Sequence, residues 1–80
     1  MEFKAMWQSV EYYKALSNPK RLAIVKLIKD SEKTVGDIAK RLQLRQANVS
    51  QHLMLLRQAG IIEMRRNGKN VYYHLKNRNK

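Results

Sequence analysis

The stretch between residues 46 and 54 includes Gln, Asn and Ser side chains, which have the chemistry needed to read the edges of DNA bases. If this stretch is a helix with Val49 directed into the core, a turn of 100° per residue sends Ala47, Gln51 and Met54 outward. Gln and Asn can form paired hydrogen bonds with adenine, Ser can meet a phosphate or a base edge, and Ala or Met can touch a thymine methyl group. The alternative is an ordinary polar helix surface. The candidate DNA contacts of this helix are Gln46, Ala47, Asn48, Ser50, Gln51 and Met54. Gln46 could equally contact a phosphate from the helix start.

A second group of candidate DNA contacts surrounds the Asn67-Gly68 pair. Cations at the tip of a hairpin can reach backbone phosphates or enter a narrow minor groove. Edge strands also carry Lys and Arg to discourage aggregation, so a merely solvated hairpin end is the alternative. Arg45 stands where a small capping residue is expected, and a phosphate contact would account for it. The candidates in this group are Arg45, Arg65, Arg66, Lys69 and Asn70, with Lys40, Arg41 and Arg57 as weaker flanking contacts.

The charge of the chain is concentrated in the half that holds these candidates. The 80 residues include 17 Lys and Arg against 6 Asp and Glu, a formal net charge of +11. Residues 1–39 carry 7 basic and 5 acidic side chains, whereas residues 40–80 carry 10 basic and 1 acidic. Nucleic acid is the most common partner of so basic a surface, although a solvated basic surface is the alternative.

Two helices are expected before the candidate site. Apolar residues recur at intervals of three or four from Phe3 to Leu16, which predicts an amphipathic helix over 3–16. Asn18 followed by Pro19 is typical of a helix start, because the Asn side chain accepts free amide hydrogens and proline fits the first helical position. The second helix therefore covers about 19–30, and its wide apolar face predicts a central position.

Two further helices joined by a tight turn should present the base-reading residues. Thr34 and Asp37 have capping-box spacing and predict a short helix over about 35–42. After a brief interruption, a fourth helix covers about 46–59 and ends at Gly60, where glycine suits a left-handed cap. This is a helix-turn-helix pattern, whose second helix normally enters the major groove.

The remaining residues predict a β-hairpin. Beyond Gly60 the hydrophobic period changes to two, and Asn67-Gly68 is a strong two-residue turn signal. That turn pairs Met64 with Val71 and Ile62 with Tyr73. The same register pairs Arg66 with Lys69, Arg65 with Asn70, and Glu63 with Tyr72. One hairpin face then carries Ile62, Met64, Val71, Tyr73 and Leu75, and the other carries Glu63, Arg65, Asn70 and Tyr72. A hairpin over about 61–75 after a base-reading helix is a wing, followed by a polar tail at 76–80.

Several function classes find no support in the composition. The chain has no cysteine, which excludes disulfides and thiolate metal sites. His52 is expected to be a hydrogen-bonded structural residue and His74 falls on a strand, so two histidines do not supply the three or four ligands of zinc. No Gly-rich phosphate loop or grouping of His with carboxylates suggests an enzyme. No apolar stretch resembles a signal peptide or membrane span, so we expect no membrane contact. The absence of cysteine suits a cytoplasmic protein, and we expect neither cofactor nor metal.

Taken together, these segments resemble the ArsR/SmtB family of winged-helix repressors over roughly residues 12–76. The matching pieces are Leu16-Ser17-Asn18-Pro19 with Arg21-Leu22, Asp37-Ile38-Ala39, Val49-Ser50-Gln51-His52-Leu53, Leu56 with Ala59-Gly60, and Tyr72-Tyr73 with Leu75. The resemblance implies a homodimer that represses an operon by binding an imperfect inverted repeat. In many members a metal ion or another signal releases the DNA.

The sequence departs from this family pattern at both kinds of metal site. Members with a cysteine pair at the third helix place it around 34–37, where this chain has Thr34-Val35-Gly36-Asp37. Other members carry Asp, His and Glu ligands on a helix after the wing, and we expect no such helix because the chain stops at Lys80. That helix usually helps form the dimer interface. The first helix is then expected to take over, with Phe3, Met6, Trp7 and Val10 as candidates.

The sequence therefore predicts one mainly helical α+β domain over 1–80, a winged helix-turn-helix of four helices and a hairpin. Its expected function is sequence-specific binding of double-stranded DNA as a homodimeric repressor of ArsR type without metal sensing. An activator, a viral or plasmid copy regulator, and control by an unidentified protein partner remain open. The alternative from another class is a winged-helix module that binds protein or RNA.

Overall fold

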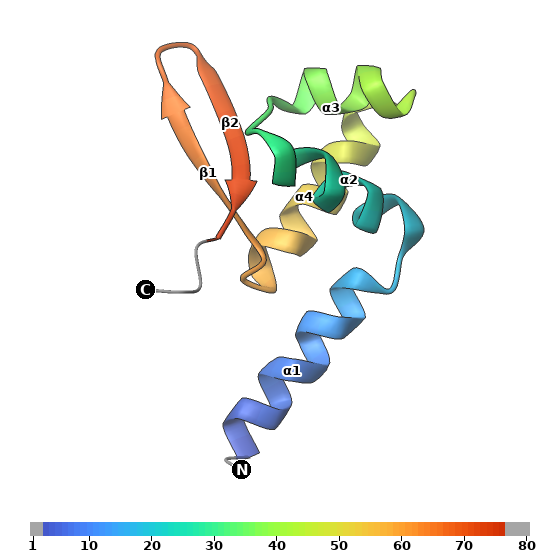
Figure 1. Ribbon diagram of the computed structural model, residues 1–80, viewed down its shortest axis with the longest axis vertical. Coiled ribbons are helices and arrows are strands. Elements are labelled where there is room, and N and C mark those ends of the chain that lie inside the picture. The colour runs from blue at the N-terminus through green and yellow to red at the C-terminus, as the bar shows by residue number, and fades with distance from the viewer. Residues whose placement is uncertain (1–2, 77–80) are drawn as a thin grey trace.

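The computed structural model describes the backbone of residues 3–76 and the side chains of residues 10–76. These residues form four helices and an antiparallel hairpin (Figure 1). The elements are α1 (Phe3–Leu16), α2 (Pro19–Asp30), α3 (Val35–Leu42), α4 (Gln46–Gln58), β1 (Ile62–Asn67) and β2 (Asn70–Leu75). The predicted winged helix-turn-helix is confirmed. The predicted helix bounds agree with the observed ones, except that α4 ends at Gln58. Of the predicted tail, only Lys76 is described.

Side-chain caps explain where α2 and α3 begin. Asn18 Oδ1 accepts hydrogen bonds from the backbone N–H groups of Lys20 at 2.8 Å and Arg21 at 3.1 Å. Thr34 Oγ1 accepts one from the N–H of Asp37 at 3.1 Å. Arg45, which precedes α4, makes no side-chain cap. Of the starts of α2, α3 and α4, the first two are therefore fixed by local side chains.

We expect Asn18→Ala to lower the free energy of unfolding by about 0.5–2 kcal/mol, because two amide hydrogens at the start of α2 lose their acceptor. The measurement is urea unfolding followed by circular dichroism. Arg45→Ala is the matched control, since it removes an N-cap side chain that makes no cap bond. Equal losses of stability in the two variants would contradict the assigned role of Asn18.

The turn between α3 and α4 is closed by a left-handed residue. Gln43 has φ 56°, and the N–H of Leu44 bonds to the carbonyl of Ala39 at 2.9 Å. At the other end of α4, Gly60 has φ +76° and is followed by Ile61, whose N–H bonds to Leu56 O at 3.0 Å. Glycine adopts this conformation without strain, as the sequence predicted for position 60.

A single apolar core joins the helices to the base of the hairpin. Helix α2 packs against α1, α3, α4 and β2, which confirms its predicted central position. On α4, Val49, Leu53 and Leu56 are fully buried, so the predicted inward direction of Val49 is correct. The buried apolar residues are Ala15, Ile24, Ile28, Ile38, Ala39, Val49, Leu53, Leu56, Ile61 and Ile62.

The predicted hairpin register is wrong. The two-residue turn is Gly68-Lys69, so Asn67 pairs with Asn70, Arg65 with Tyr72, and Ile62 with Leu75. Gly68 has φ +66° and takes the first turn position, where glycine suits a type II′ turn. Each β1 residue thus pairs two positions further along β2 than predicted. Because side chains alternate with a period of two, the predicted faces survive this shift.

The segment before α3 forms an unpredicted contact with β2. The N–H of Lys33 bonds to Tyr73 O at 3.2 Å, and the N–H of Tyr73 bonds to Lys33 O at 2.8 Å. The Lys33 side chain is buried, and its Nζ donates to Leu27 O at 3.1 Å and to Ser31 Oγ at 2.8 Å. Through Lys33, β2 is tied to the C-terminal end of α2.

Candidate nucleic-acid interface

The outer face of α4 presents most of the predicted base-reading residues to solvent. Ala47, Asn48, Ser50 and Gln51 are all exposed, whereas Val49 between them is fully buried. The exposed amide and hydroxyl groups have no hydrogen-bond partner within the described residues, so they are available to a ligand. This arrangement supplies the donors and acceptors that reading of base edges requires.

Two predicted members of this face have neighbours that the sequence did not indicate. Gln46 is exposed, but its Nε2 lies 3.3 Å from the point that a Cβ on Gly36 would occupy, so its side chain lies over the first turn of α3. Met54 is 48% exposed and lines an open hollow between α4 and β1 together with Met64. The other residues that line the hollow are Arg57, Gln58, Gly60, Ile62, Glu63 and Lys76.

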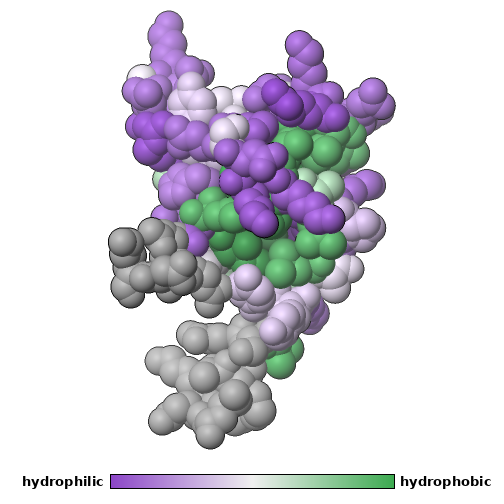
Figure 2. Space-filling model, viewed as in Figure 1, coloured by the Kyte–Doolittle hydropathy of each residue, from purple (hydrophilic) through white to green (hydrophobic). Residues whose placement is uncertain are grey.

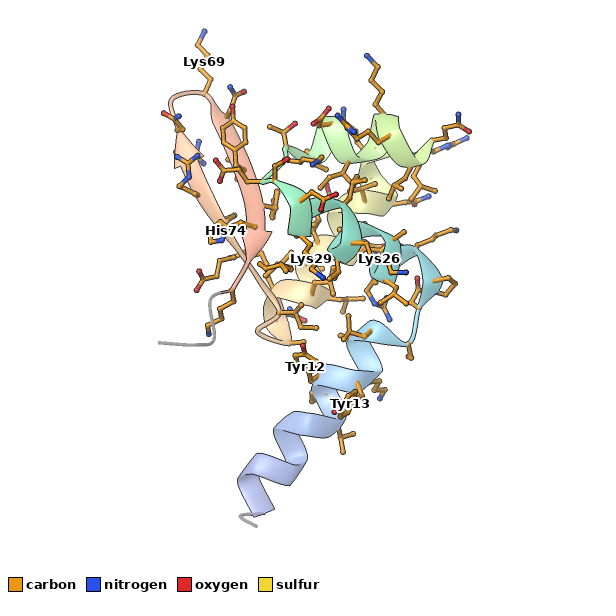
Figure 3. The ribbon with its side chains drawn as sticks, in the orientation of Figure 1. Tyr12, Tyr13, Lys26, Lys29, Lys69 and His74 are labelled. Atoms are coloured by element: carbon orange, nitrogen blue, oxygen red, sulfur yellow. The ribbon has the colours of Figure 1, made fainter. Side chains whose placement is uncertain are left out.

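The wing places its cations on different faces. Arg66 lies opposite Val71, Arg65 lies opposite Tyr72, and Lys69 is at the turn. In Figure 3 the side chain of Lys69 extends beyond the hairpin tip. Within the described residues Arg66 and Lys69 form no ion pair, and both are exposed, as is Asn70. Free cations at a hairpin tip are suited to phosphate contacts.

Arg65 differs from the other wing cations because it has a partner. Its Nε lies 3.2 Å from Glu32 Oε1, and its Nη2 bonds to Glu32 Oε2. The hydrogen bond from Arg65 holds the pKa of the Glu32 carboxyl below its usual value. The same pair raises the pKa of Arg65. Sequence reasoning missed Glu32 because it lies 33 positions from Arg65 and no local pattern connects them.

The polar surface gathers at the end of the molecule that holds α3 and the wing tip. Figure 1 shows these two features at the end remote from the start of α1. Figure 2 shows hydrophilic side chains over the same end and apolar side chains nearer the centre. The free wing cations, Arg66 and Lys69, belong to this end.

His52 packs against α2, which agrees with its predicted structural role. Its Nδ1 lies 3.4 Å from Nη1 of Arg21, and Arg21 Nε also donates to Ala15 O at 2.6 Å. Burial lowers the pKa of His52, and the charges of Arg21 and Lys20 lower it further. Because Arg can only donate, the neutral ring accepts at Nδ1. Arg21 thereby links the end of α1 to the middle of α4.

Among the described side chains of α1, those of its last turns pack against the core. Tyr12, Ala15 and Leu16 pack there, whereas Val10 is 58% and Tyr13 70% exposed. Figure 1 shows the rest of the helix projecting from the body. Of the predicted interface residues, Val10 is exposed as a dimer contact requires. The side chains of Phe3, Met6 and Trp7 lie outside the described residues.

The described part of the chain offers no cluster suited to a metal ion. Among these residues no three or more His, Cys, Asp or Glu side chains come together. His52 and His74 each bond within the protein, His52 to Arg21 and His74 to the carbonyl of Leu75. None of the described helices is long and apolar enough to cross a bilayer.

Comparison with known proteins connects this geometry to a family of regulators. The sequence model of the family described as "Bacterial regulatory protein, arsR family" matches residues 18–64. The transcriptional activator HlyU of Vibrio cholerae is 38% identical over 68 residues, which are 85% of this chain and 63% of that protein. The transcriptional repressor SdpR of Bacillus subtilis is 40% identical over 63 residues, which are 79% of this chain and 70% of that protein.

Solved structures give the same result. A structure of HlyU from Vibrio cholerae superposes with a TM-score of 0.87 at 36% identity, and covers 98% of this chain and 84% of that one. The homodimeric winged helix-turn-helix DNA-binding domain Mb0332 of Mycobacterium bovis gives a TM-score of 0.89 at 31% identity. It covers 92% of this chain and 68% of that one. Since the family model matches more than half of the residues, the chain belongs to the arsR family of bacterial regulatory proteins.

Proposed function

We propose that this chain regulates transcription by binding a specific double-stranded DNA sequence as a homodimer. The observation that carries the proposal is the exposed face of α4, where Asn48, Ser50 and Gln51 have no partner within the described residues. The free cations of the wing, Arg66 and Lys69, add phosphate contacts to the same interface. Base-edge contacts give specificity, and phosphate contacts give affinity and position.

The proposed interface includes every residue predicted from the sequence, and the cations without an ion pair, Arg66 and Lys69, supply its main phosphate contacts. Helix α4 contributes Gln46, Ala47, Asn48, Ser50, Gln51 and Met54, and the wing and flanks contribute Arg45, Arg65, Arg66, Lys69 and Asn70. Two copies pair through α1 in this proposal, with Phe3, Met6, Trp7 and Val10 at the contact. A two-fold dimer requires an inverted repeat with half-sites about 10 base pairs apart, or a multiple of that spacing.

The proposed activity is repression in the cytoplasm without a metal effector or an enzymatic step. SdpR is a repressor and HlyU an activator, so relatives of this chain act in both directions. A repressor needs only to occupy DNA where polymerase would bind, which the proposed dimer achieves without further parts. The aligned residues of this chain span 63% of the length of HlyU.

The decisive experiment is selection of bound duplexes from a random DNA library, with the mass in solution measured by light scattering. An inverted repeat enriched by a dimer supports the proposal. Reporter transcription with that repeat placed at the promoter then separates repression from activation. Failure to enrich any sequence, or a stable monomer, would favour the protein-binding or RNA-binding module instead.

Substitutions of Gln51 and of Lys69 should weaken DNA binding in different ways. We expect Gln51→Ala to cost about 1–3 kcal/mol on the enriched duplex and to relax preference at one base position. Lys69→Ala should weaken binding to all duplexes evenly, because a phosphate contact carries no sequence information. Competition binding with matched and mismatched duplexes measures both effects. Equal loss on every duplex in both variants would refute the assignment of these roles.

A further inference from the structure

One guanidinium in the wing is bound on two sides. The Nε and Nη2 edge of Arg65 faces the Glu32 carboxylate, and its Cζ lies 5.4 Å from the ring centroid of Tyr72. Tyr72 is the direct cross-strand partner of Arg65, which keeps the ring beside the side chain. One of the two guanidinium edges that can form paired bonds with a phosphate is therefore already occupied by a carboxylate.

Glu32 stands on a firmly held segment. Its neighbour Lys33 exchanges two backbone hydrogen bonds with Tyr73 of β2. The Lys33 side chain anchors the same segment to α2 through Leu27 O and Ser31. The segment connects α2 to α3, so the bond from Glu32 to Arg65 ties strand β1 of the wing to the helix-turn-helix.

The neighbouring cation Arg66, unlike Arg65, has no carboxylate partner within the described residues. It lies on the other face of the hairpin, is exposed, and forms no ion pair within the described residues. A phosphate that approaches Arg66 meets an uncompensated positive charge, whereas one that approaches Arg65 also meets the negative charge of Glu32. Neutralisation of a phosphate releases counterions from the DNA, and a cation that a carboxylate already compensates neutralises less of that charge.

We infer that Glu32 and Arg65 are positioning residues of the DNA interface, which fix the wing relative to α4, and that Arg66 and Lys69 bind the phosphates. This inference rests on the proposed function. It assigns a role to Glu32, which composition and spacing did not single out. It also moves Arg65 from direct contact with DNA to support of the wing, beside the unchanged roles of the free cations.

The test compares adjacent residues of the same strand. Arg65→Met and Arg66→Met each remove one charge from β1, and affinity for the enriched duplex is measured over a series of salt concentrations. We expect Arg66→Met to reduce the salt slope by about one per protomer. Arg65→Met should keep the slope and weaken binding by at most about fivefold, because it removes an exposed ion pair. A slope change of the same size in both variants would overturn the inference.

A charge exchange gives a second and independent outcome. Glu32→Gln removes the bond that holds the wing but leaves Arg65 uncompensated, so we expect it to raise the salt slope. The double variant E32Q/R65M should cost no more than Arg65→Met alone. The double variant E32R/R65E restores an opposite-charge pair without changing net charge, so we expect most of the affinity to return. If Arg65 bonds to a phosphate, the exchange instead places a carboxylate beside that phosphate, and affinity falls below that of Arg65→Met.

Amide hydrogen exchange in DNA-free protein separates this inference from the proposed function. Glu32→Gln and Arg65→Met should both speed the exchange of the Lys33 and Tyr73 amides, whereas Arg66→Met should leave it unchanged. Unchanged exchange in all three variants contradicts a role for the pair in fixing the wing. Wild-type protein that binds no duplex would refute the proposed function, while the exchange measurement still decides whether the pair holds the wing.

Discussion

Leu56→Ala is expected to lower the free energy of unfolding by about 2–5 kcal/mol. Leu56 is fully buried on α4 and belongs to the core that joins the helices to β1. Its truncation removes apolar contacts and leaves a cavity that the surrounding helices fill only in part. Since small domains are stabilised by only about 5–15 kcal/mol, this single change removes a large share of the total. Urea unfolding at a fixed protein concentration measures the loss.

The adjacent residue provides the matched control. Leu55 is 42% exposed, and Leu55→Ala removes the same atoms from the same helix without opening a core cavity. If Leu56→Ala does not fold, Leu56→Met keeps the volume and should cost less than about 1.5 kcal/mol. Equal losses in Leu55→Ala and Leu56→Ala would mean that the buried face of α4 is wrongly assigned. The protein concentration is held fixed because the proposed dimerisation would make the apparent stability depend on concentration.

The helices could be predicted from the sequence because their signals are local. Asn18 with Pro19, and Thr34 with Asp37, place acceptors at the first free amide groups, and the structure shows both caps in use. The apolar period then determines which face is buried, as Val49 shows. A start without a cap was also predictable, because the Arg45 side chain offers no acceptor.

The turn of the wing could not be placed to the residue. Asn67-Gly68 and Gly68-Lys69 both contain the glycine that a tight turn requires, and both give the same two faces. The structure favours the second turn, and its register places Arg65 opposite Tyr72. The Lys33 contact with Tyr73 also holds β2, and the sequence gives no sign of that contact.

Only the part of the candidate site that lies on α4 could be predicted, because helix geometry determines which of its side chains are exposed. Because each residue of a helix is rotated by about 100° from the last, burial of Val49 predicts that Asn48, Ser50 and Gln51 are exposed. The pair between Glu32 and Arg65 depends instead on how the wing packs against the segment before α3. Such contacts join distant parts of the chain through tertiary packing, which no local pattern encodes.

Binding to DNA should fall steeply as salt concentration rises. Arg45, Arg66 and Lys69 are exposed and form no ion pair within the described residues, which gives six such cations in the proposed dimer. Each phosphate they neutralise releases condensed counterions, whose return at high salt opposes binding. With about six phosphates contacted, affinity for the enriched duplex should drop by roughly a thousandfold between about 50 and 200 mM salt. Titration by fluorescence anisotropy measures the slope.

Lys26→Met on the exposed side of α2 is the control, because it removes a charge outside the proposed interface (Figure 3). A flat salt response in the wild type would contradict phosphate contacts as the source of affinity. A loss of slope in Lys26→Met equal to that in Arg66→Met would show that net charge, rather than the wing, governs the interaction.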